Sequence, residues 1–154
     1  MQFINYFSAS IVSFLGLLAG IILVKIAREE QKMLKKYLKI LEISLLALMM
    51  VFAFFYYINN IFYLLILAAY FIFLIIVHYK ITDTIKKYIL VYATLGILFF
   101  LSSVNLNFFA IESSLIFLYG LPVASILCQN MKNHFVRILL YNSIFLILSN
   151  VLFM

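Results

Sequence analysis

The sequence is poor in the residues on which soluble, disordered and disulfide-bonded proteins depend. Its 154 residues include one cysteine, one proline, four glycines and no tryptophan, and only 10% of the residues are charged. A single cysteine cannot form a disulfide within the chain, and so little glycine and proline excludes collagen-like and low-complexity classes. Too few polar residues remain to cover the surface of a soluble domain of this size.

Motifs that carry chemistry are also missing. Asp83 is the only aspartate, and the sequence contains no His-Glu-x-x-His, no Gly-x-Ser-x-Gly and no glycine-rich phosphate loop. His78, Cys128 and His134 could form a metal site or a Cys-His nucleophile, but they lack the spacing of zinc ligands. Two interfacial histidines and a packing cysteine are the favoured interpretation. We therefore predict no enzyme activity, no catalytic or metal-ligating residue and no cofactor.

Long apolar runs occupy most of the chain, in which 68% of the residues are hydrophobic. A helix needs roughly 20 apolar residues to cross a bilayer core about 30 Å thick. The runs show no apolar/polar alternation, which a transmembrane barrel requires. We predict an all-α fold, a polytopic membrane helix bundle that forms one domain over residues 1–154. Its six predicted transmembrane helices cover residues 3–26, 40–58, 61–79, 88–104, 107–128 and 136–154.

The basic residues cluster at three of the five connections between these spans. Every lysine and arginine lies in, or within one turn of, residues 28–39, 80–87 and 129–135, whereas the short turns 59–60 and 105–106 carry no charge. The positive-inside rule then predicts a multi-pass protein of the cell membrane with these three basic loops in the cytoplasm and both termini outside. The net charge of +6 indicates contact with anionic headgroups of the lipid bilayer, not with nucleic acid.

The first basic connection, residues 28–39, has helical periodicity. Met33, Leu34 and Tyr37 recur on one face, and lysines occupy the opposite face. This pattern predicts a basic amphipathic cytoplasmic segment, which either lies in the membrane interface or extends the second span. An interfacial anchor is favoured over a docking surface for a partner.

The three basic connections also divide the six spans into pairs of equal orientation. The triplet at residues 36–38, Lys-Tyr-Leu, recurs as Lys-Tyr-Ile at residues 87–89. Internal repeats are common in transporters, and the pairing predicts three repeated helical hairpins. Chance similarity within apolar sequence is the alternative.

Small residues form stripes on two predicted helices. Gly16 and Gly20 lie four residues apart in the first span, and Gly120 and Ala124 lie four apart in the fifth. Such stripes let helix backbones approach closely in lipid. We predict that they are helix-packing positions, either within the chain or against a second subunit. A transporter this small usually oligomerises, so we expect a homo-oligomer or a membrane-protein partner. Pro122, beside Gly120, predicts a kink.

Glu112 is the one carboxylate that the sequence places well inside a span. Ser113, Ser102, Ser103 and Ser13 are expected at a similar depth. Intramembrane ionisable residues usually face a bundle interior or a wet cavity. We therefore predict an outward-facing polar site for a cation, a proton or a polar solute. The alternative is a glutamate that only links helices by hydrogen bonds.

The run from Gly16 through Ala27-Arg28-Glu29-Glu30 to Lys36-Tyr37 resembles small, uncharacterised archaeal membrane proteins with several spans. This resemblance implies no activity. From the residues themselves we expect a small transporter or channel-like protein with its polar site at Glu112. A non-catalytic structural or assembly subunit of a membrane complex is the alternative. A lipid-active membrane enzyme ranks third, because the motifs for such chemistry are missing.

Overall fold

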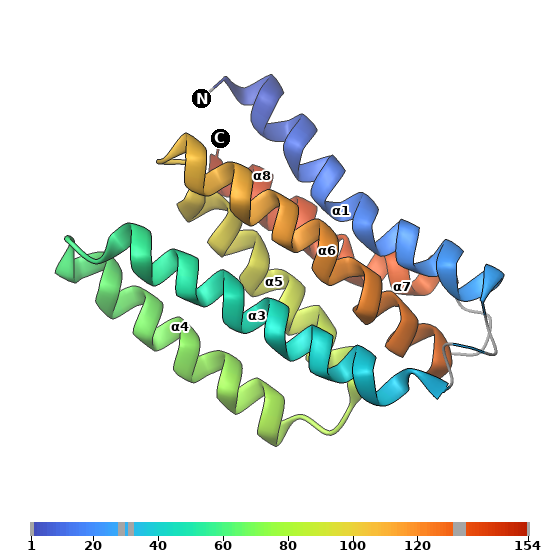
Figure 1. Ribbon diagram of the computed structural model, residues 1–154. Helices are drawn as coiled ribbons and strands as arrows, with labels where there is room; N and C mark the ends of the chain where they lie inside the picture. The colour runs from blue at the N-terminus through green and yellow to red at the C-terminus, as the bar shows by residue number, and fades with distance from the viewer. Residues whose placement is uncertain (1, 28–29, 31–32, 131–134, 154) are drawn as a thin grey trace.

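The computed structural model describes residues 2–27, 30, 33–130 and 135–153, and this part of the chain is all-α (Figure 1). α7 and α8 follow each other directly and together make one apolar segment, Phe135–Phe153. The helices are α1 (Phe3–Ile26), α3 (Lys35–Tyr57), α4 (Ile61–Lys80), α5 (Thr84–Ser102), α6 (Leu106–Asn130), α7 (Phe135–Asn142) and α8 (Ile144–Phe153).

Within the described residues, six helices are long and apolar enough to cross a membrane, which confirms the predicted number of such helices. α1 and α4 match the predicted spans 3–26 and 61–79 to within one residue. α3 and α5 begin five and four residues earlier than predicted, because hydropathy marks the apolar part of a helix and not its polar first turn. In α5, for example, the Asp83 carboxylate accepts a hydrogen bond from the Ile85 amide at 3.0 Å and caps the helix start.

The basic segment before the second span continues into the helix. α3 begins at Lys35, and just before it the Leu34 amide donates to the Glu30 carbonyl at 3.0 Å. Residues 35–39 of the predicted basic segment therefore belong to the same helix as the second predicted span. Residues 28–29 and 31–32 lie outside the described part of the chain.

α6 is the central helix of the bundle and α4 is the most peripheral. α1 and α3 pack on either side of α6, α4 packs against α3, and α5 packs against α6 and α8 (Figure 1). In the described residues α1 packs mainly on α6, and the first predicted hairpin, α1 with α3, is not a closely packed pair. The predicted threefold repeat is therefore not confirmed.

The predicted small-residue stripes face each other where α1 crosses α6. A Cβ atom added to Gly16 would overlap the backbone of Phe117, and one added to Gly120 would overlap the backbone of Gly16 and Leu17. A Cβ on Gly20 would come within 2.6 Å of the Ala124 Cβ. This face of α1 is therefore covered by α6 of the same chain, and α6 continues as one helix through Pro122.

Four lysines, Lys25, Lys35, Lys80 and Lys86, lie at the end of the bundle where α1 and α4 finish and where α3 and α5 begin. We call this end the basic end. The opposite end carries the start of α1, the end of α8 and the turn at Asn60 (Figure 1).

The orientation of the basic end can be tested by cysteine labelling. In a Cys128→Ser background, a membrane-impermeant maleimide is expected to label Asn60→Cys in intact cells and Lys86→Cys only after the cells are opened, because the lysines favour the cytoplasm. Both positions are exposed in the fold. Labelling of Lys86→Cys in intact cells would contradict the predicted topology.

Candidate functional site

The serines predicted to surround Glu112 direct their hydroxyl groups elsewhere. Ser13 donates to the carbonyl oxygens of Ala9 at 2.9 Å and Ser113 at 3.0 Å, so it links α1 to α6. Ser102 and Ser103 donate to carbonyls of the preceding turn of α5, each at 2.7 Å. Serines on helices commonly bond in this way.

Ser113 itself donates to the Ala110 carbonyl at 3.0 Å. With Ser13 and Ser114 it lines a cavity at the α1–α6 crossing. The serines therefore tie helices and helix turns together, and no hydrogen bond joins a serine to Glu112 in the described part of the chain.

Glu112 lies in the interior of the bundle. Its side chain is 0% exposed, and neither carboxylate oxygen has a hydrogen-bond partner among the described residues. The sequence suggested an outward-facing site, whereas in this conformation the carboxyl is enclosed. More than nine in ten buried polar groups in proteins are hydrogen-bonded, so a glutamate with both oxygens unpartnered is unusual.

An aromatic layer separates Glu112 from the end opposite the basic end. Phe108, one helical turn from Glu112 on the same face of α6, is fully buried. Its ring lies 4.9 Å from that of Tyr56 and 5.7 Å from that of Tyr57. The Tyr57 hydroxyl donates to the Leu101 carbonyl at 2.5 Å and so ties α3 to α5. This layer lies between Glu112 and that end of the bundle.

Toward the bundle centre, Glu112 is near the hydroxyl of Tyr70 on α4. Glu112 lies within electrostatic reach of this hydroxyl. Thr94 donates to the Val91 carbonyl at 2.8 Å. The Tyr70 hydroxyl is buried, and the Thr94 side chain lies within hydrogen-bonding range of it.

Two further tyrosines continue this polar region toward the basic end. Tyr92 of α5 and Tyr119 of α6 are 1% and 0% exposed, and their ring centroids lie 6.0 Å apart. Tyr119 is within electrostatic reach of Tyr70, Tyr88 and Tyr92. Neither the Tyr92 nor the Tyr119 hydroxyl has a hydrogen-bond partner within the described part of the chain.

Glu42 of α3 terminates the region near the basic end. The Tyr88 hydroxyl donates to Glu42 Oε2 at 2.9 Å, and Lys87 Nζ lies 3.7 Å from Glu42 Oε1. The Glu42 side chain is 2% exposed and so lies inside the bundle, not at its surface. α3 begins at Lys35, so Glu42 lies two turns inside the helix, where it faces α5.

These six side chains form a sequence of buried polar groups along the bundle axis. The start of α5 and the end of α6 both lie at the basic end. At 1.5 Å per residue, Tyr88 and Tyr92 lie about 6 Å and 12 Å from this start of α5, and Glu112 lies about 27 Å from this end of α6. We call this set the buried polar chain. Its members, in order, are Glu42, Tyr88, Tyr92, Tyr119, Tyr70 and Glu112.

The sequence pattern indicated Glu112 but not the tyrosines. A signal was present, because Tyr70, Tyr92 and Tyr119 lie near the middles of their spans. Tyrosine in membrane proteins is enriched at the two interfaces instead. A tyrosine at mid-span therefore indicates a polar interior, and three of them on three helices could have been recognised together.

The described residues contain no group of three or more His, Cys, Asp or Glu side chains that could hold a metal ion. His78 lies at the basic end of α4, and Cys128 is a buried free thiol on α6. His134, the third member of that weak candidate, lies outside the described residues.

Comparisons of the chain with protein-family models, with curated proteins and with solved structures find no match. The resemblance to archaeal membrane proteins therefore stays a prediction, and the function has to be argued from the residues of this chain.

Proposed function

We propose that this protein spans the membrane six times and conducts protons along the buried polar chain as a small transporter or channel-like protein. The observation that carries the proposal is the set of unpartnered buried oxygens. Within the described residues, both oxygens of Glu112 and the hydroxyls of Tyr92 and Tyr119 lack hydrogen-bond partners, and the Tyr70 hydroxyl lies within electrostatic reach of Glu112 and Tyr119.

The chemistry of these groups suits proton movement. A carboxyl group can bind and release a proton, and a tyrosine hydroxyl can donate and accept a hydrogen bond at the same time. Carboxylates inside membrane spans are costly, and they mark ion paths and proton relays. A glutamate retained only to hold helices together is expected to have its oxygens satisfied, because an unsatisfied buried group costs about 1–3 kcal/mol or more.

The two ends of the buried polar chain differ in access. At the basic end, Glu42, Lys87 and Tyr88 line a polar cavity of about 370 Å³. At the other end, the aromatic layer with Phe108 and Tyr57 encloses Glu112. We infer that this conformation is closed on the Glu112 side and that conduction requires the aromatic layer to open. The lysines further favour a cytoplasmic basic end and outer termini.

Conservative tyrosine variants test the proposal. In proteoliposomes that contain a pH-sensitive dye, a potassium diffusion potential is expected to drive proton uptake by the parent protein. Tyr92→Phe and Tyr119→Phe each remove one hydroxyl and keep the ring, so uptake is expected to fall about tenfold, the effect of about 1.4 kcal/mol added to the barrier. Tyr37→Phe is the matched control, because Tyr37 is 66% exposed on α3.

The results separate proton conduction from a purely structural role. Parent-like uptake by both Tyr92→Phe and Tyr119→Phe would contradict conduction through the buried polar chain. No uptake by the parent protein, together with co-purification of a stoichiometric membrane partner, would favour the alternative of an assembly subunit. A homo-oligomer in the membrane is compatible with conduction by each chain, since the buried polar chain lies within one copy.

A further inference from the structure

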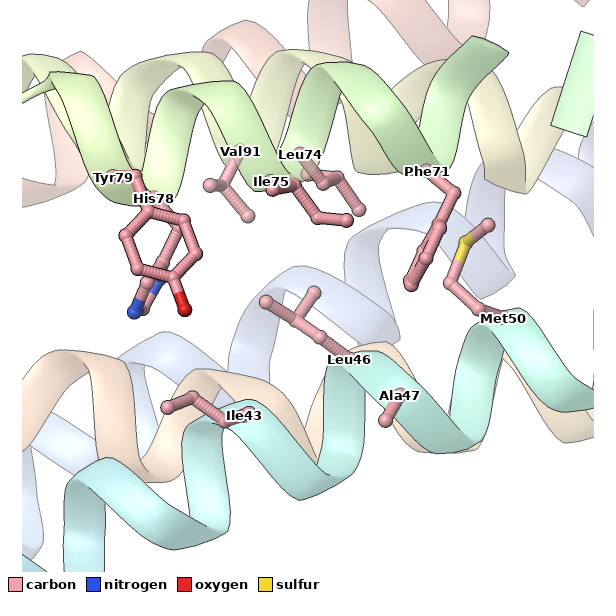
Figure 2. A pocket seen from close by; sticks show the side chains of 10 residues that line it. All are labelled: Ile43, Leu46, Ala47, Met50, Phe71, Leu74, Ile75, His78, Tyr79 and Val91. Carbon is pink, nitrogen blue, oxygen red and sulfur yellow. The ribbon is translucent and has the colours of Figure 1, made fainter. Parts of the chain in front are cut away.

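Two cavities of opposite character meet between α3 and α4 near the basic end. The polar cavity of about 370 Å³ is lined mainly by charged or polar side chains, among them Lys35, Lys39, Glu42, His78 and Lys87. A second, apolar cavity of about 290 Å³ lies between α3 and α4 (Figure 2). Ile43 and His78 line both cavities, so the two cavities adjoin and together offer a polar and an apolar part.

The polar part carries an excess of positive charge. Three lysines and one carboxylate line it, which leaves two positive charges even when His78 is neutral. The carboxylate, Glu42, is already engaged by Lys87 at 3.7 Å and by the Tyr88 hydroxyl at 2.9 Å. Lys35 and Lys39 are exposed, and within the described residues no ion pair neutralises them. This part of the site therefore suits an anion.

The apolar part suits a hydrocarbon chain. Side chains of α3 and α4 face each other across it, with His78 at one end and Phe71 and Met50 at the other (Figure 2). From Ile43 to Met50 the groove follows seven residues of α3, which is about 10 Å at 1.5 Å per residue. The groove thus leads from the lysines toward the middle of the bundle, parallel to the helices.

We infer that this joined site binds one anionic phospholipid, with its phosphate headgroup among Lys35, Lys39 and Lys87 and one acyl chain in the groove between α3 and α4. Basic pockets between spans at the cytoplasmic face are suited to anionic headgroups. The polar-to-apolar direction of the site matches that of a lipid in the adjoining leaflet. A free anion would contact the lysines but leave the apolar groove empty. A neutral lipid would fill the groove but would not pair with the lysines. The headgroup position shares the polar cavity that leads to Glu42, but the inference does not rest on proton conduction.

The experiment uses the absence of tryptophan from the natural sequence. Phe71→Trp places a single fluorophore in the groove, and Ile75→Trp is a second groove reporter. Ile72→Trp lies on the same helix, is 58% exposed and does not line the groove, so it reports the surrounding lipid. The full-length protein is reconstituted in phosphatidylcholine with a minor fraction of phosphatidylglycerol that carries brominated acyl chains, which quench tryptophan.

Quenching of the groove reporters is expected to saturate at a lower phosphatidylglycerol fraction than quenching of Ile72→Trp. Adding Lys35→Gln and Lys39→Gln is expected to weaken the preference for phosphatidylglycerol about tenfold, since each lysine near the surface attracts the headgroup. The matched pair Lys36→Gln and Lys86→Gln removes the same charge from exposed positions that do not line the site. This control pair is expected to change the preference much less.

Three outcomes would overturn the inference. Equal quenching of groove and control reporters would mean that no lipid occupies the groove. Equal loss of preference with both lysine pairs would mean that only the surface potential attracts phosphatidylglycerol. Displacement of the brominated lipid by millimolar inorganic phosphate would mean that the headgroup position takes free anions and that the acyl chain contributes nothing.

Discussion

Replacing Glu112 with glutamine is expected to lower proton uptake at least about tenfold while the helix bundle stays folded. Glutamine has nearly the same shape as glutamate, but its amide cannot bind and release a proton. The side chain is fully buried and makes no hydrogen bond within the described residues, so the substitution breaks no observed contact. An added barrier of about 1.4 kcal/mol slows a step about tenfold, and we expect uptake to fall by at least about this factor.

The measurement is dye-reported proton uptake in proteoliposomes, with thermal stability in detergent as the check on folding. Glu30→Gln is the matched control, because it removes a carboxylate that is exposed at the basic end. Parent-like uptake by Glu112→Gln would remove this residue from the mechanism. It would also leave the unpartnered carboxylate without a functional explanation.

A second substitution at Glu112 separates function from structure. Glu112→Leu replaces an unpartnered polar group by an apolar one of similar size, and such replacements are neutral or stabilising when no hydrogen bond is lost. Under proton conduction, Glu112→Leu is expected to be as stable as the parent and inactive. A clear fall in the melting temperature would indicate instead that the carboxyl holds neighbouring polar groups in place.

Replacing Gly16 with leucine is expected to give the largest loss of stability in the chain. A Cβ at this position would overlap the backbone of Phe117, and a backbone cannot move aside as the end of a flexible side chain can. Overpacking costs about 1–3 kcal/mol and occasionally more. At about 2–4 °C per kcal/mol for a chain of this length, we expect the melting temperature to fall by about 5–10 °C, or the protein to fail to assemble.

Leu15→Ala provides the matched control on the same helix. Leu15 is 41% exposed and neighbours Gly16 in sequence, but lipid can replace the contacts that its side chain loses. Gly120→Leu should behave like Gly16→Leu, because its Cβ would overlap the backbone of Gly16 and Leu17. Equal melting temperatures for Gly16→Leu, Gly120→Leu and Leu15→Ala would show that α1 and α6 do not cross closely in the membrane.

The two experiments address different faces of α6. Gly120 lies on the face that meets α1, and its role is close packing of two backbones. Glu112 and Tyr119 lie toward the interior that α6 shares with other helices. We expect the glycine variants to lose stability but to keep proton uptake per folded protein. We expect Glu112→Gln to keep stability but to lose proton uptake. This pair of results would establish that α6 serves close packing and proton conduction on separate faces.

The sequence by itself determined the class of fold and the number of apolar helices, because hydropathy and charge are properties of contiguous residues. Runs such as residues 61–79 need no partner to be recognised, and the structure has α4 over Ile61–Lys80. The sequence also shows directly that Glu112 is a carboxylate within an apolar run, where carboxylates are rare. It likewise shows that Gly16 and Gly20 have the spacing that permits a close helix contact.

Only the tertiary structure decided which helix faces meet. The serines were expected near Glu112 because they share its depth, but their hydroxyls bond to backbone carbonyls. Glu42 lies near the start of the second predicted span, yet it is buried and faces Tyr88, a residue 46 positions away in the chain. Depth along a helix follows from residue number, whereas direction around the bundle depends on how α3, α4, α5 and α6 pack. The buried polar chain combines residues from all four of these helices, so its members become neighbours only after the bundle has formed.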